Sequence, residues 1–206
     1  MRIDARSTSS GIRTTNVTAI RIRRVPDQDA PIPARNPDEL LNLLYASRGL
    51  SDPAEAAPGL GALAPVTALH GLDAAVNRLV VAIQSDQSIL VVGDYDADGA
   101  TGSALAVRGL RDLGARRVSF LVPSRFSNGY GMSPAVVEAA HAQGADLILT
   151  VDNGISSHAA IARARELGLS VVVTDHHLPG DVLPEADAIV NPNQPGCDFP
   201  SKHLAG

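Results

Sequence analysis

The sequence predicts an α/β fold, in which helices flank a parallel β-sheet that follows a short helical and irregular N-terminal lead-in. Two observations carry this prediction. Between residues 88 and 191, short apolar runs alternate with segments of helical periodicity, which is typical of consecutive strand–helix–strand units. The apolar runs are also continuous, as in strands that are buried on both faces.

Composition and charge limit the class of protein. The chain has 206 residues, of which 45% are hydrophobic, so it can bury a core. Its formal charge of −5 argues against a generic basic nucleic-acid coat. The single cysteine, Cys197, excludes a disulfide scaffold and a cysteine-rich zinc site. The apolar runs are too short to span a membrane, and the polar N-terminus has no apolar signal core, so we expect a cytoplasmic protein.

The N-terminal part is expected to be irregular and then helical. Residues 1–36 are rich in Arg, Ser and Thr, which predicts a flexible basic segment. Residues 37–87 form the helical lead-in, with helices predicted over 38–47 and 72–84. The second helix is expected to share one apolar face among Leu72, Val76, Leu79, Val80 and Ile83.

Residues 88–206 are expected to form the main domain. Its predicted elements are strands at 88–93, 118–123, 146–152, 170–175 and 186–191, and helices at 99–114, 134–143 and 156–168. Right-handed crossovers bring the carboxyl ends of such strands to one edge of the sheet, where α/β proteins bind ligands.

Acidic residues and histidines gather at three of these strand ends. The loops are GDYDADG (93–99), TVDNG (150–154) and TDHH (174–177). A single Asp after a strand is typical of a helix cap or a turn. Carboxylates crowded at one edge, however, must be protonated or neutralised by a cation. Carboxylate and imidazole together suit Mn²⁺ and similar ions, so the sequence predicts a divalent metal site.

Two other segments carry candidates for substrate contact. Gly99 and Thr101 lie where a helix begins, so its N–H groups could hold a phosphate oxygen, or the turn could be purely structural. Arg125 and Tyr130, in the loop SRFSNGYGMS, are candidates for a phosphate contact and for base stacking; a plain surface loop is the alternative. His158 is expected on a helix surface. The sequence contains no GxxxxGK[ST] phosphate loop and no GxGxxG dinucleotide loop.

The strings GDYDADGATG, TVDNGIS, VTDHHLPGD and NPN, in this order, resemble the DHH phosphoesterase family. The likeness is strongest to the bacterial members that are exonucleases specific for single-stranded DNA, which PSRFSNGYGMSP also resembles. It covers residues 38–206.

The resemblance implies a role for each matching residue. The metal ligands would be Asp96, Asp98, the bridging Asp152 and His176. His177 would face the scissile phosphate, and Asp175 would orient the histidine pair. The supporting residues would be Asp94 and Asn153. Many family members have a histidine four residues before the position of Asp96, but here that position is Val92. We therefore expect a more open or weaker first metal site.

The resemblance also implies a function. It predicts a 5′→3′ exonuclease that uses two divalent ions, Mn²⁺ or Mg²⁺, to hydrolyse single-stranded DNA in recombination and repair. Partners by resemblance would be a single-strand-binding protein and a helicase. Because the family's catalytic domain continues beyond the position of Gly206, the chain is expected to be an N-terminal portion that is nearly inactive by itself.

Three alternatives stay open from the residues. The chain could belong to a DHH phosphodiesterase acting on short oligonucleotides or cyclic dinucleotides, or serve as a non-catalytic DHH binding module. A Rossmann-like nucleotide binder is disfavoured, because Asp94, Asp96 and Asp98 would repel a bare pyrophosphate.

Overall fold

The computed structural model describes residues 36–47, 61, 63–123, 131–202 and 204. The chain divides into two compact units, Met1–Gly61 and Ala62–Gly206. Within the first unit, helix α1 (Pro37–Ser47) begins where Asn36 Oδ1 accepts a hydrogen bond from Glu39 N, at 2.9 Å. The basic segment predicted for residues 1–36 lies outside the described residues, apart from Asn36.

The second unit contains the sheet and the helices that cover it. Its elements in order are the 3₁₀ helix η3 (Val66–Ala68), α2 (Leu72–Gln84), β1 (Ile89–Gly93), α3 (Ala97–Asp112), β2 (Val118–Leu121), α5 (Pro134–Ala142), β3 (Leu147–Val151), α6 (His158–Glu166), β4 (Ser170–Thr174) and β5 (Ala188–Val190). The predicted fold class is confirmed. None of the described helices is long and apolar enough to cross a membrane.

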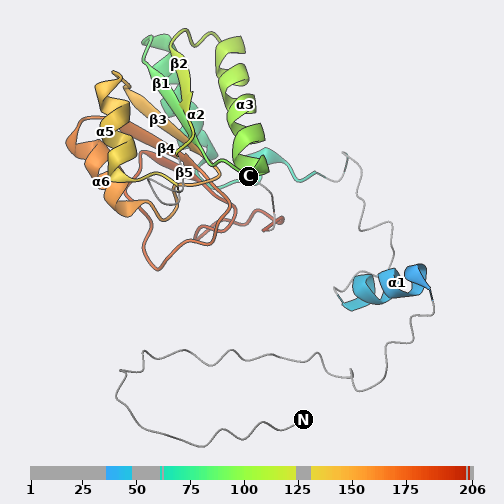
Figure 1. Ribbon diagram of the computed structural model, residues 1–206. Coiled ribbons are helices and arrows are strands. Elements are labelled where there is room, and N and C mark those ends of the chain that lie inside the picture. The colour runs from blue at the N-terminus through green and yellow to red at the C-terminus, as the bar shows by residue number, and fades with distance from the viewer. Residues whose placement is uncertain (1–35, 48–60, 62, 124–130, 203, 205–206) are drawn as a thin grey trace, which may run out of the picture. The chain divides into compact units, whose positions relative to one another are not determined.

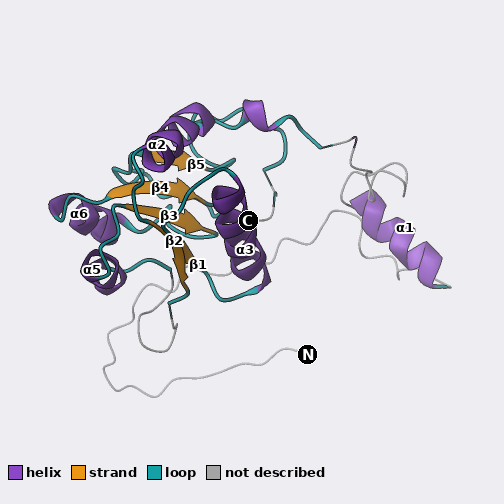
Figure 2. Cartoon of the chain, turned by 90° about the horizontal axis from the view of Figure 1, so that it is seen from above, coloured by secondary structure: helices purple, strands orange, loops and turns teal. Residues whose placement is uncertain are grey.

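The five strands form one parallel sheet in the order β2-β1-β3-β4-β5. Helices α5 and α6 pack together on one face, and α2 and α3 cover the other (Figure 2). The central strands β1 and β3 are buried along their whole length, as the continuous apolar runs predict. Two apolar layers therefore hold the sheet, one on each face.

The strand order reverses between β1 and β3, which are neighbours (Figure 1). After β1 the chain crosses to β2 on one side, and after β3 it crosses to β4 on the other. The connections leave the carboxyl ends of β1 and β3 in opposite directions, which makes this edge the topological switch point of the sheet. Ligands of α/β sheets bind at such a switch point.

The buried face of α2 differs from the prediction. Ala75 and Ala82 are fully buried, with Leu79 and Ile83 packed beside them, whereas Val76 and Val80 are 47% and 42% exposed. The two alanines let the helix approach the sheet closely, and that approach turns the valines outward. The predicted face was therefore right at Leu79 and Ile83, but it omitted the two buried alanines and wrongly included Val76 and Val80.

Candidate metal centre

The loop after β1 supplies two carboxylates at the switch point. Asp94 follows the last residue of the strand and is buried, and its Oδ1 accepts a hydrogen bond from Tyr95 N at 2.9 Å. Asp96 is the N-cap of α3, where its Oδ1 accepts from Gly99 N at 3.2 Å. A Cβ on Gly99 would lie 2.3 Å from the carbonyl oxygen of Asp94, so only glycine allows the helix to begin this close to the strand.

The loop after β3 places Asp152 beside these two residues. Asp152 is 2% exposed and has a φ of 62°, a left-handed conformation that non-glycine residues rarely adopt. Its N–H donates to Thr174 O at 3.0 Å. The next residue, Asn153, donates through Nδ2 to Val92 O at 3.0 Å and to Val151 O at 2.9 Å. These bonds join the ends of β1, β3 and β4 around the Asp152 carboxylate.

The segment after β4 supplies the two histidines. His176 Nε2 lies 2.9 Å from Asp152 Oδ1, and the side chain of His176 is 28% exposed. His177 Nδ1 lies 2.7 Å from Asp175 Oδ1. Asp175 is buried, and its two oxygens accept from the backbone N–H groups of His176, His177 and Ile155. Its carboxylate is thus used to fix the histidine segment.

Two groups of side chains at this edge could each hold a metal ion. The first consists of Asp94, Asp96 and Asp152, and the second of Asp152, His176 and His177; the ligand atoms of each lie within 4.8 Å of one another. Asp152 belongs to both groups. Burial raises the pKa of Asp152 above its ordinary value, and Asp96 raises it further, whereas His176 and His177 lower it.

The donor chemistry of these groups fits divalent ions. Three carboxylates held this close repel one another, and burial of Asp152 limits the water that could screen them. A divalent cation removes this repulsion, and mixed oxygen and nitrogen ligands suit Mn²⁺. The residues present therefore fit divalent ions, and Asp152 belongs to both groups of potential ligands.

The structure groups the sequence candidates differently from the resemblance in two respects. Asp98, expected as a ligand, belongs to neither group among the described residues; it lies in the first turn of α3, and not in an irregular loop. Asp94, expected as a supporting residue, belongs to the first group. Its position directly after a buried strand was the available signal. Val92 is fully buried within β1, and its side chain has no ligand atom. Asp94, two residues later, contributes a carboxylate oxygen to the first group.

Other substrate-contact candidates are placed differently or lie outside the described residues. The Gly99 N–H is used in capping α3, and Thr101 Oγ1 donates to Ala97 O at 2.7 Å within the same helix. These bonds favour the structural alternative for that turn. Arg125 and Tyr130 lie outside the described residues.

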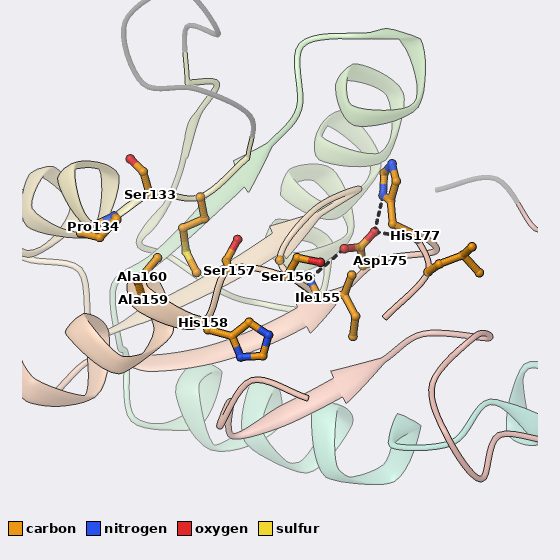
Figure 3. A pocket seen from close by; sticks show the side chains of 13 residues that line it. Ser133, Pro134, Ile155, Ser156, Ser157, His158, Ala159, Ala160, Asp175 and His177 are labelled. Carbon is orange, nitrogen blue, oxygen red and sulfur yellow. Dashed lines mark hydrogen bonds and ion pairs between the residues drawn. The ribbon is translucent and has the colours of Figure 1, made fainter. Parts of the chain in front are cut away.

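A cavity of about 840 Å³ opens beside the histidine segment (Figure 3). The segments that lead into α5 and α6 line it with Ser133, Ser156 and Ser157, His158 lines it from the first position of α6, and His177 lies on its wall. Asp175 also lines it, hydrogen-bonded to Ile155 and His177, as Figure 3 shows. His158 is exposed at the start of α6, as expected for a surface residue, and it also lines this cavity. The cavity presents hydroxyl and imidazole groups among apolar side chains, close to the candidate metal ligands.

The sequence reasoning also gave no role to the residues that follow β5. Asn191 and Asn193 donate hydrogen bonds to the backbone carbonyls of His177 and His176. The available signal was the NPN string at the end of the fifth predicted strand. Because β5 pairs with β4, that string had to lie beside the histidines.

Comparison with known proteins relates the chain to a protein family. The family model described as "DHH family, N-terminal domain" matches residues 88–205. The single-stranded-DNA-specific exonuclease RecJ of Salmonella typhimurium is 55% identical over 184 residues, which are 89% of this chain and 32% of that protein. The same-named protein of Escherichia coli is 54% identical over the same shares. The chain thus spans about a third of the length of these relatives.

Two solved structures resemble the fold. A crystal structure of exonuclease RecJ bound to manganese is 41% identical, with a TM-score of 0.62, over 68% of this chain and 35% of that one. RecJ from Thermus thermophilus in complex with Mn²⁺ is 38% identical, with a TM-score of 0.58, over 78% and 22%.

Proposed function

Because the chain belongs to the DHH family, as its motifs predicted, we propose that it carries the metal-binding part of a 5′→3′ exonuclease that hydrolyses single-stranded DNA. The observation that carries the proposal is the pair of ligand groups that meet at Asp152 on the switch-point edge. The names and metal ions of the similar proteins support it.

The proposal assigns Asp94, Asp96 and Asp152 to one ion, and Asp152 and His176 to the other, with Mn²⁺ favoured and Mg²⁺ also suitable. When bound, two such ions activate water and stabilise the charge that develops on a phosphate. Asp98 remains a predicted ligand of this site, as the resemblance implies. The carboxylates of Asp94 and Asp96 each accept a backbone N–H, and that of Asp152 contacts His176 Nε2, so these ligand atoms are positioned before an ion arrives.

His177 has a different proposed role. Its Nδ1 is bonded to Asp175, which is itself held by three backbone N–H groups. When Nδ1 donates to Asp175, Nε2 of the neutral imidazole can accept a proton, and in the protonated imidazolium it can donate to a phosphate oxygen. We therefore assign His177 to the scissile phosphate and Asp175 to its orientation.

The cavity beside His177 supports a nucleic-acid substrate. Around the acidic centre, this wall offers donors from Ser133, Ser156, Ser157 and His158, which can bond phosphate and sugar oxygens. Asp175 is the one carboxylate among the described residues that line it, and its oxygens already accept hydrogen bonds. The proposal runs the strand through this cavity, and Arg125 and Tyr130, which lie outside the described residues, stay as predicted contacts.

The remaining predicted properties belong to the same proposal. A DNA substrate in recombination and repair favours a cytoplasmic location. A single-strand-binding protein and a helicase stay as predicted partners. Two alternatives remain. A phosphodiesterase of short oligonucleotides or cyclic dinucleotides would differ from the exonuclease in its substrate, and a non-catalytic module would hydrolyse none of them.

The test is a chimera in which this chain replaces the matching segment of the Salmonella relative. We expect it to release mononucleotides from the 5′ end of long single strands with Mn²⁺, and Asp152→Asn in the chimera to stop the release. Parallel assays with dinucleotides and cyclic dinucleotides separate the first alternative. Binding of Mn²⁺ without hydrolysis of any of these substrates would support the non-catalytic module.

A further inference from the structure

The loop that follows β5 lies against the backbone of the two histidines. Strand β5 pairs with β4 so that Val190 is opposite Thr174, and Val190 O accepts from Asp175 N at 3.1 Å. Beyond this bond both strands end, and their continuations run side by side. Residues 191–194, with the sequence NPNQ, therefore meet residues 175–177 directly.

Two asparagine amides make the contact. Asn191 is fully buried, and its Nδ2 donates to His177 O at 3.0 Å. Asn193 Nδ2 donates to His176 O at 2.6 Å. The two asparagines are also joined, because Asn191 Oδ1 accepts from Asn193 N at 2.7 Å. Each histidine carbonyl thus has its own amide donor.

We propose that Asn191 and Asn193 are positioning residues, which direct the imidazoles of His176 and His177 by holding the carbonyls of these two residues. The inference rests on the proposed function, because it gives these histidines their roles at the ions and the phosphate. It adds a requirement that the DHH motif alone does not contain.

The peptide planes of the histidine segment are held by hydrogen bonds from two sides. On one side, Asp175 Oδ1 accepts from the N–H groups of His176 and His177. On the other side, the asparagine amides hold the carbonyls of the same two residues. Bonds on both sides fix the planes, and hence the direction in which each imidazole leaves the backbone. Metal and catalytic sites require side chains placed to within about 0.5 Å, so loss of one side is expected to matter.

The same loop also has anchors that do not reach the histidines. Gln194 Nε2 donates to His70 O and Ile189 O, both at 2.9 Å, which ties the loop to the start of α2 and to β5. Lys202 Nζ donates to Pro192 O at 2.6 Å and to Cys197 O at 2.5 Å. Gln194 touches neither histidine carbonyl, so it offers a matched control within the same loop.

The experiment compares Asn193→Leu with Gln194→Met in the 206-residue chain. Asn193→Leu keeps nearly the same shape and removes the donor to His176, while Asn193 N still bonds Asn191. Gln194→Met removes two amide hydrogen bonds that do not reach the histidines. Asn193→Gln is the conservative variant, since it retains an amide donor on a side chain one methylene longer.

Two readouts report on the histidines without any catalysis. In metal-free protein, ¹H–¹⁵N spectra of the imidazoles should show changed or broadened His176 and His177 signals in Asn193→Leu, and unchanged signals in Gln194→Met. Electron paramagnetic resonance of unbound Mn²⁺ should show affinity about 10–100-fold weaker in Asn193→Leu, the usual effect of losing a partner behind a metal ligand. Asn193→Gln should recover part of both.

Thermal melts separate positioning from stability. Gln194→Met should lower the melting temperature at least as much as Asn193→Leu does. A folded Asn193→Leu protein with wild-type imidazole signals and Mn²⁺ affinity within twofold of wild type would overturn the proposal. If Asn193→Leu does not fold, Asn193→Ser gives the same comparison. Absence of nuclease activity in the chimera would contradict the proposed function and leave these readouts standing.

Discussion

At the scale of single residues, Asp152 carries the most conflicting demands. It is buried, its backbone is left-handed, and it lies beside the carboxylate of Asp96, which contributes to raising its pKa. Each of these features destabilises a metal-free fold, and strained backbone of this kind costs on the order of 1–3 kcal/mol. Such a residue persists where the surrounding structure holds it, and here the Asp152 N–H is bonded to Thr174 O.

The first prediction is that Asp152→Asn separates stability from metal binding. Asparagine keeps the shape, tolerates the left-handed region and carries no charge, so the metal-free variant should melt at or above the wild-type temperature. Its affinity for Mn²⁺ should fall by more than about 100-fold, because loss of an outer partner already causes 10–100-fold. Thermal melts in chelator and resonance titrations with Mn²⁺ measure the two effects.

Asp152→Ala is the control for the backbone. Alanine also removes the charge but does not tolerate a φ of 62° as asparagine does. It should therefore melt below Asp152→Asn while losing Mn²⁺ equally. Mn²⁺ affinity unchanged in either variant would contradict the shared-ligand role.

The second prediction distinguishes the two neighbouring histidines. His176 lies 2.9 Å from Asp152, whereas His177 is bonded to Asp175. His176→Ala should therefore weaken Mn²⁺ binding, and His177→Ala should leave it largely intact. In the chimera, His177→Ala should lower kcat about 10²–10⁴-fold, the usual contribution of a positioned proton-transfer group. Loss of metal together with activity in His177→Ala would instead make His177 a ligand.

At the scale of elements, the start of α3 depends on close packing against β1. The third prediction is that Gly99→Ala destabilises the protein, because the added Cβ would lie 2.3–2.6 Å from backbone atoms of Asp94. The displacement should also weaken Mn²⁺ binding through Asp94 and Asp96. Gly109→Ala, in the same helix, meets nothing within 4 Å and should stabilise by about 0.5–1 kcal/mol. Chemical denaturation of both variants measures the contrast, and equal effects would contradict it.

The elements also show which features can be predicted from sequence. The strands were found because each is a short, mainly apolar run, and three of their carboxyl ends carried the clustered acids and histidines. The predicted helix at 99–114 begins earlier, at Ala97, because Asp96 caps it through Gly99 N. The helix-cap alternative was considered for such residues, but the metal-site interpretation of the acidic loop was preferred, so this cap was not assigned. The contacts of Asn191 and Asn193 depend on strand pairing, which residue types do not reveal.

At the scale of the whole molecule, bound metal should stabilise the fold. The ligand groups join the ends of β1, β3 and β4, which exist together only in the folded state. The fourth prediction is that Mn²⁺ at 100 times its dissociation constant adds about 2.7 kcal/mol, and raises the melting temperature by about 5–10 °C. Asp152→Asn should show no such rise. An equal rise in both would indicate binding elsewhere on the surface.

The last prediction concerns how much of the activity these 206 residues carry by themselves. The strand–helix units from β1 to β4 follow one another directly, so the sheet should form and show α/β circular dichroism. Substrate binding should be weak, because no Lys or Arg is among the described residues that line the cavity, and the chain carries a formal charge of −5. A single strand binds mainly through cationic contacts to its phosphates. The chain alone should therefore release negligible mononucleotide in an assay where the chimera digests the same labelled strand. Digestion by the chain at the chimera's rate, stopped by Asp152→Asn, would contradict this and place strand binding within these residues.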